Sequence, residues 1–107
     1  MQQITPTELK KRLDNGEPLM LLDVREGWEF ELCRIDDSLH LPLADLIQLQ
    51  SMEQLDPKQQ IITICHHGIR SQQAALLLKR NGFDNVCNLV GGIHHWSIDV
   101  DPSLPRY

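Results

Sequence analysis

The stretch IITICHHGIRS, residues 61–71, carries the strongest structural signal in this chain of 107 residues. Its first four residues form a β-branched apolar run, which predicts a short buried strand. The residues that follow Arg70 favour a helix to about Arg80. Cys65 is therefore expected in a tight loop between the carboxyl end of a strand and the N-terminus of a helix. The free N–H groups and the dipole of that helix favour an anion at this point.

Cys65 is the candidate catalytic residue of this loop. The thiolate rather than the thiol is the nucleophile, and the local positive field favours the thiolate. Arg70 adds a permanently charged, planar donor for an oxyanion, although the alternative is an ordinary surface ion pair. His66 and His67 either tune the pocket or are merely tolerated in the loop. The residues expected to surround a bound substrate are His66, His67, Gly68, Ile69, Arg70 and Ser71.

The composition predicts one small globular domain over residues 1–107. Hydrophobic residues make up 41% and charged residues 23%, which is ordinary for a folded domain. The net charge of -5 argues against general nucleic-acid binding. No apolar run is long enough to span a membrane, and the N-terminus has no secretory signal. Three cysteines are too few for a disulfide framework, so a cytoplasmic location is expected.

Strand-like and helix-like segments alternate along the chain. Thr5 to Glu8 forms a capping box that begins the first helix, and Gly82-Phe83 ends the longest helix as a Schellman motif. The repeated β-then-α order predicts an α/β fold, with a central parallel sheet of about five short strands and helices on both faces. The expected strands are residues 19–24, 38–41, 61–64 and 86–89. The expected helices run from Pro6 to about residues 14–16, over residues 28–32, 43–49 and 71–80, and from just after Gly91-Gly92 through Trp96.

These motifs, in this order and spacing, resemble a rhodanese-homology domain over nearly the whole chain. Residues 21–26 with Glu29-Phe30 resemble the first signature of the family, and residues 65–71 resemble its active-site loop. Residues 82–96 resemble its C-terminal signature, whereas residues 33–38 depart from the family pattern. The tail after residue 100 is similar to the end of rhodanese domains fused to ubiquitin-like-protein-activating enzymes of the molybdopterin and thiamin type.

The resemblance implies a sulfurtransferase that works through a persulfide on Cys65. In such a protein the sulfur comes from a donor such as thiosulfate and passes to a nucleophilic acceptor, either a small molecule or a sulfur-relay protein. No metal and no organic cofactor is implied, and neither nucleic acid nor a membrane is expected as a partner. The opposing hypothesis is a catalytically idle module that uses the same fold to dock a partner protein.

In the family that the chain resembles, the length of this loop separates sulfur transfer from phosphate-ester hydrolysis. Four residues lie between Cys65 and Arg70, one fewer than in the related cysteine-dependent phosphatases. A phosphate needs room for several oxygens inside the ring of N–H groups, so the shorter loop suits a smaller target. The sequence therefore favours sulfur transfer over phosphatase or arsenate-reductase chemistry.

Five further residues have simpler expected roles. Asp23 and Arg25 are predicted to form structural hydrogen bonds near a strand end. Cys87 and Trp96 are predicted to pack in the core, with a place beside the site as the alternative for Trp96. Cys33 is either a buried structural residue or a resolving thiol.

Two charged or metal-binding features remain. The histidine pairs His66-His67 and His94-His95 have no standard metal-ligand spacing, and a metal would occupy the thiolate, so no metal site is predicted. An acidic cluster is expected to be a solvated face, with a docking surface for a basic protein as the alternative. Its members are Glu26, Glu29, Glu31, Asp36 and Asp37.

Overall fold

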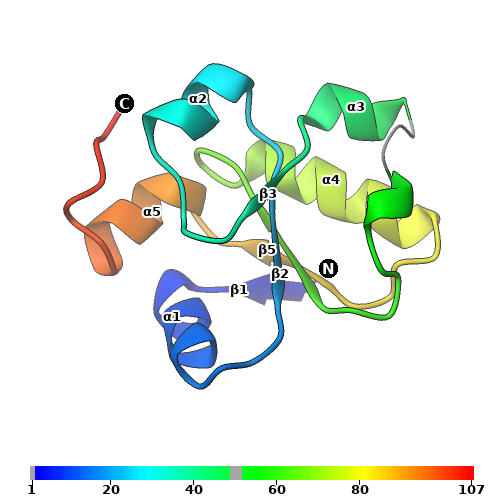
Figure 1. The fold of residues 1–107 in the computed structure, drawn as a ribbon, viewed down its shortest axis with the longest axis horizontal. Helices are drawn as coiled ribbons and strands as arrows, with labels where there is room; N and C mark the ends of the chain where they lie inside the picture. The colour runs from blue at the N-terminus through cyan, green and yellow to red at the C-terminus, as the bar shows by residue number, and fades with distance from the viewer. Residues whose placement is uncertain (1, 49–51) are drawn as a thin grey trace.

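A computed structural model describes residues 2–48 and 52–107 of the chain (Figure 1). Five strands form one sheet in the order β1-β5-β4-β2-β3, and every neighbouring pair is parallel. This arrangement confirms the predicted α/β fold. The strands are β1 (Gln2–Ile4), β2 (Met20–Asp23), β3 (Leu39–His40), β4 (Ile61–Ile64) and β5 (Val86–Leu89). The helices are α1 (Pro6–Asp14), α2 (Gly27–Leu32), α3 (Leu43–Ile47), α4 (Ile69–Arg80) and α5 (Gly92–Asp99), with a 3₁₀ turn at Met52–Gln54.

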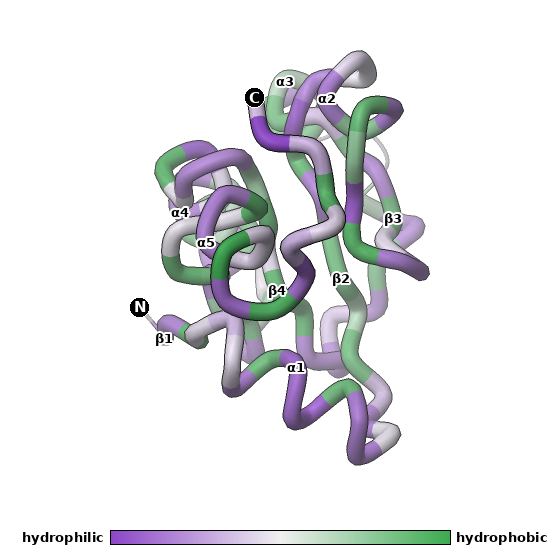
Figure 2. The backbone as a smooth tube through the Cα atoms, turned by 90° about the vertical axis from the view of Figure 1, so that its left-hand side faces the viewer, coloured by the Kyte–Doolittle hydropathy of each residue, from purple (hydrophilic) through white to green (hydrophobic). Residues whose placement is uncertain are grey.

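Helices cover both faces of the sheet, as predicted. Helices α3 and α4 pack together on one face, and α1 and α5 pack together on the other. Successive side chains of a strand point to opposite faces, so Ile61 joins the core cluster under α4 while Ile62 joins the cluster under α1 and α5. Figure 2 shows hydrophobic residues along β2, in the middle of the molecule. Cys65 belongs to the cluster under α4, at the carboxyl end of β4.

The predicted helix caps are present. The Thr5 hydroxyl accepts a hydrogen bond from the Glu8 N–H at 3.2 Å, and the Glu8 carboxylate accepts one from the Thr5 N–H at 3.3 Å. At the end of α4, Gly82 has φ +89° and the Phe83 N–H donates to the Leu78 carbonyl at 3.1 Å. Both caps depend on residues that are close together in the sequence, which explains why the sequence predicts them correctly.

Several element boundaries differ from the prediction. The sequence does not predict strand β1, because only Ile4 of its three residues is buried and it has no apolar run. Helix α5 continues three residues past Trp96, and α4 begins at Ile69 rather than after Arg70. Helix α3 ends at Ile47 with Gln48 as its C-cap, so the predicted helix is too long at Gln48, and its predicted last residue, Leu49, lies outside the described residues. These shifts leave the Cys65 loop in its predicted place between β4 and α4.

Candidate active site

The Cys65 sulfur is held by the loop that links β4 to α4. The Gly68 N–H donates a hydrogen bond to Cys65 Sγ at 3.0 Å. Gly68 caps α4 with φ +104°, a left-handed conformation that glycine adopts without steric cost. The Ser71 hydroxyl lies 3.3 Å from the same sulfur and also donates to Asn88 Oδ1. Cys65 itself is only 1% exposed, so the loop encloses the sulfur closely.

Asn88 is a supporting residue that the sequence does not suggest. It is buried in β5 and its amide donates to the Gly68 carbonyl at 3.2 Å, in addition to its contact with Ser71. A buried amide has to satisfy its hydrogen bonds, so it fixes the groups that it bonds. The available signal was a polar residue inside an apolar strand.

The first turn of α5 closes the other side of the loop. The Ile93 N–H donates to the Cys65 carbonyl at 2.8 Å, and the His94 N–H donates to the His66 carbonyl at 3.0 Å. This close approach depends on Gly92, which has φ +59°. A Cβ atom at Gly92 would lie 2.3 Å from the Cys65 carbonyl oxygen.

Replacing Gly92 with alanine should therefore destabilise the protein strongly. The new methyl group meets backbone, which has no alternative rotamer, and the positive φ adds strain, so we expect a loss of about 3 kcal/mol in the free energy of unfolding. Urea denaturation measures this loss. Gly16→Ala is the matched control, because Gly16 has φ +75° but a Cβ atom at that position would have no neighbour within 4 Å. The control should cost about 1 kcal/mol, from the positive φ alone. Equal losses in the two variants would contradict the steric argument.

Arg70 forms a bidentate ion pair with Glu29 of α2. Its Nη1 donates to Glu29 Oε1 at 2.6 Å and its Nη2 donates to Oε2 at 2.9 Å. The Tyr107 hydroxyl also donates to Glu29 Oε2, at 2.8 Å. These hydrogen bonds, that from Arg70 foremost, lower the pKa of Glu29 to about 2, and the pair raises the pKa of Arg70.

The prediction of a solvated acidic face was wrong for Glu29. Its side chain is 4% exposed, whereas the other four members of the cluster are exposed as expected. The partners that bury Glu29 lie 41 and 78 positions further along the chain, so a local charge pattern does not indicate them. Tyr107 was not predicted at the site for the same reason.

The ion pair of Glu29 predicts a pH-dependent stability. The pKa of Glu29 is lower in the folded state than the usual value of about 4.3, so its stabilising effect is complete above that value and is lost as the pH falls through about 2. We expect Glu29→Gln to lower the free energy of unfolding by about 2 kcal/mol at pH 7, after discounting for the partly exposed Arg70.

Urea denaturation at pH 7, 5, 3 and 2 checks this expectation. The difference in the free energy of unfolding between wild type and Glu29→Gln should become smaller towards pH 2, because Glu29 of the wild type takes up a proton there. Glu31→Gln is the control, since Glu31 is exposed on the same helix, and its effect should stay within about 0.5 kcal/mol. If the loss in the free energy of unfolding caused by Glu29→Gln is the same at every pH, the carboxylate charge does not stabilise the fold.

Asp23 and Arg25 have the structural role that was predicted. Both side chains are fully buried, and Arg25 Nη2 donates to Asp23 Oδ2 at 2.8 Å. The same guanidinium donates to the Cys33 carbonyl and to the Tyr107 hydroxyl. Burial opposes the charge of Arg25, but Asp23 outweighs it and raises the pKa of Arg25. Tyr107 thus links this buried pair to the ion pair of Arg70.

The two other cysteines lie away from the Cys65 loop. Cys33 and Cys87 belong to the core cluster under α1 and α5, whereas Cys65 belongs to the cluster under α4. Cys33 Sγ lies 3.5 Å from the Pro105 carbonyl oxygen. This placement favours the structural interpretation of Cys33 over a resolving thiol. Trp96 is buried in the same cluster as Cys33, as expected.

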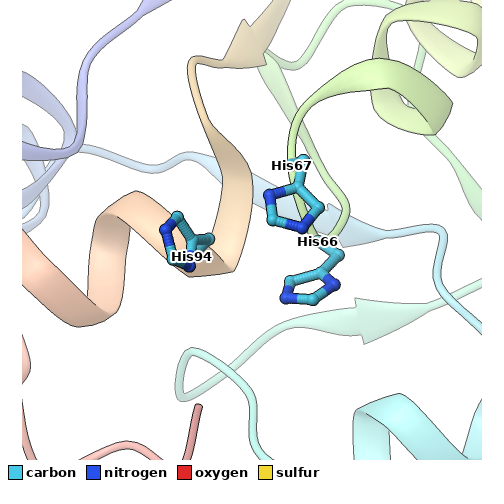
Figure 3. A group of neighbouring side chains, drawn as sticks. All are labelled: His66, His67 and His94. Carbon is cyan, nitrogen blue, oxygen red and sulfur yellow. The ribbon is translucent and has the colours of Figure 1, made fainter. Parts of the chain in front are cut away.

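Three histidines meet beside the loop (Figure 3). Figure 3 shows His66 and His67 on the segment before α4 and His94 facing them from the start of α5. The His66 ring stacks on Tyr107 at a centroid distance of 3.9 Å. Burial, and then the nearby His67, lowers the pKa of His66. The sequence spacing did not predict this group, because His66 and His67 lie in the loop before α4 whereas His94 comes from α5, much further along the chain.

The chain belongs to the rhodanese-like domain family, which it matches over residues 5–99. It is 36% identical over 110 residues to the adenylyltransferase and sulfurtransferase MOCS3-2 of Zea mays, covering 98% of this chain and 23% of that protein. It is also 36% identical over 95 residues to YrkF of Bacillus subtilis, covering 89% of this chain and 50% of that protein. The chain therefore spans half or less of these two relatives. The family match supports sulfur transfer as the class of activity.

Solved structures agree with the fold. A rhodanese-like domain protein from Staphylococcus aureus superposes with a TM-score of 0.84 at 27% identity, covering 100% of this chain and 99% of that chain. Among the described residues, no helix combines the length and the apolar character that crossing a bilayer requires.

Proposed function

We propose that this protein, as a single domain of residues 1–107, is a sulfurtransferase that carries a sulfane sulfur as a persulfide on Cys65. The observation that carries the proposal is the Cys65 sulfur at the end of β4, 3.0 Å from the Gly68 N–H and facing the start of α4. Such donors stabilise negative charge on sulfur in both the thiolate and the persulfide. The maize relative, named as an adenylyltransferase and sulfurtransferase, supports the same chemistry.

The proposed reaction has two steps. The Cys65 thiolate attacks the outer sulfur of a donor such as thiosulfate, a new S–S bond forms, and the S–S bond of the donor breaks to release sulfite with the electron pair. A nucleophile such as cyanide then attacks the outer sulfur of the persulfide, and the Cys65 thiolate leaves. Neither step needs a metal or an organic cofactor. The three cysteines are free, which suits a reducing compartment such as the cytoplasm.

Arg70 is the proposed binding group for an anionic donor. Its ion pair with Glu29 uses one N–H of each terminal nitrogen, and a guanidinium has five N–H donors, so others remain for an oxyanion. The pair also holds the guanidinium in a fixed orientation near Cys65, whose charge contributes to raising the pKa of Arg70. Loop N–H groups from His66 to Ser71 complete the proposed substrate site.

A second candidate function follows from one observation. Cys65 is only 1% exposed, and a catalytically idle module that docks a partner protein would not need an accessible sulfur. In a sulfurtransferase, by contrast, the side chains around Cys65 have to move before a sulfur donor can reach the sulfur.

If the protein transfers sulfur, its proposed natural acceptor is a small nucleophile or a sulfur-relay protein.

Intact mass spectrometry separates the two functions. Incubation of the reduced protein with thiosulfate should add the mass of one sulfur atom, and cyanide should remove it with release of thiocyanate. Cys65→Ser should show no gain. A wild-type protein that gains no sulfur from thiosulfate or from a persulfide donor would favour the docking module.

Arg70→Ala should slow sulfur uptake more than sulfur release. Thiosulfate is a dianion, and loss of a charge-assisted bidentate contact of about 1.5–3 kcal/mol corresponds to an uptake rate about 10- to 100-fold lower. Arg70→Lys should recover only part, because lysine lacks the planar fork. Rapid-mixing measurements of thiosulfate consumption and of cyanide addition to preloaded protein compare the two steps. If the rates of sulfur uptake and sulfur release fall equally, Arg70 shapes the loop as a whole and does not act mainly on the donor.

A further inference from the structure

Three imidazole side chains form a compact group beside the Cys65 loop. One ring nitrogen from each of His66, His67 and His94 lies within 4.8 Å of the others. The ring centroids of His66 and His67 are 3.9 Å apart, and those of His67 and His94 are 5.1 Å apart. Figure 3 shows the rings converging from two different segments of the chain.

The backbone holds the two segments together, so the group is part of the fold. The His94 N–H donates to the His66 carbonyl at 3.0 Å. The Gly92 backbone packs so closely on the same loop that a Cβ atom there would lie 2.7 Å from the His66 carbonyl oxygen. The positions of His66 and His94 are therefore coupled by contacts that do not involve their side chains.

The imidazole nitrogens are open to a ligand. Within residues 2–48 and 52–107, no protein group forms a hydrogen bond with a ring nitrogen of His66, His67 or His94. His67 is exposed and the other two are half-buried, so an ion reaches the group from solvent. The positive charge of Arg70, which also lies close enough to act on His66, is balanced by its ion pair with Glu29.

We propose that His66, His67 and His94 form a binding site for a divalent transition-metal ion, Zn²⁺ in the first place. Imidazole suits Zn²⁺, and three histidines with a fourth position open to water are a recurrent zinc ligand set. Zinc–nitrogen bonds of about 2.0–2.1 Å would bring the nitrogens slightly closer than they are, which side-chain rotation supplies. The ligand set leaves out Cys65, whose sulfur is bound by Gly68 and lies near Ser71.

Titration of the reduced protein with Zn²⁺, followed by calorimetry, tests the site. Co²⁺ provides a second readout, because a tetrahedral site gives intense visible absorption bands. We expect one ion per chain, and His94→Asn should weaken Zn²⁺ binding by about 100-fold, since even loss of an outer partner of a ligand costs 10- to 100-fold. His67→Asn should act in the same direction.

Two control variants separate this site from other ways of holding zinc. His95→Asn is the matched control, because His95 is exposed on the same helix as His94 but lies outside the group. The affinity of this variant for Zn²⁺ should equal that of wild type. Cys65→Ser should also retain binding. Absence of Zn²⁺ binding by wild type at about 100 μM, equal affinity in wild type and His94→Asn, or loss of binding in Cys65→Ser would each overturn the proposal. These readouts measure metal binding alone, so they do not depend on sulfur transfer.

Discussion

Cys65→Ser is expected to abolish sulfur transfer from thiosulfate to cyanide. A serine hydroxyl in the same loop cannot form a persulfide, and no other cysteine lies between a strand end and a helix N-terminus. The loop N–H groups would still bind an anion, but no sulfur would be carried. A thiocyanate assay on purified protein should show activity at the level of the reaction without protein.

Two cysteine variants serve as controls for this result. Cys33→Ser and Cys87→Ser should keep most of the activity, because both residues belong to the core cluster on the other face of the sheet from Cys65. Circular dichroism checks that all three variants are folded. Substantial turnover by folded Cys65→Ser, or its loss in folded Cys33→Ser, would contradict the assignment of Cys65.

The Cys65 loop was predictable because its determinants are adjacent in the sequence. A β-branched run, a turn that contains glycine and a helix start follow one another in residues 61–71, and each acts through short-range physics. The same is true of the capping box at Thr5 and the Schellman motif at Gly82. Strand β1 has no such signal, since it is defined by pairing of Gln2 with Cys87 at the far end of the chain.

The supporting residues of the site were not predictable from local patterns. Glu29 stands between Glu26 and Glu31 in the sequence, which is typical of a solvated face, yet Arg70 and Tyr107 bury it. Only the tertiary fold brings these partners together. His94 is a similar case, because the start of α5 docks on the Cys65 loop and places it beside His66. Residues that orient a site from a distance carry little signal of their own.

The buried ion pair of Asp23 and Arg25 predicts the second large effect. Asp23→Asn leaves the Arg25 guanidinium charged and fully buried with no opposite charge beside it. Breaking such a pair costs about 3–5 kcal/mol, a large part of the total stability of about 5–15 kcal/mol typical of a small domain. Urea denaturation should show a lower midpoint with an unchanged slope.

Two further variants show whether the loss comes from the unpaired charge. Asp14→Asn removes an exposed pair with Lys10 and should cost less than about 0.5 kcal/mol. Replacing both buried partners, as Asp23→Leu with Arg25→Met, should recover part of the loss, because no charge is then left without a partner. Tyr107 and the Cys33 carbonyl would still lose their contacts with Arg25, so recovery should be incomplete. If Asp23→Asn costs no more than Asp14→Asn, the buried pair does not hold the strand end in place.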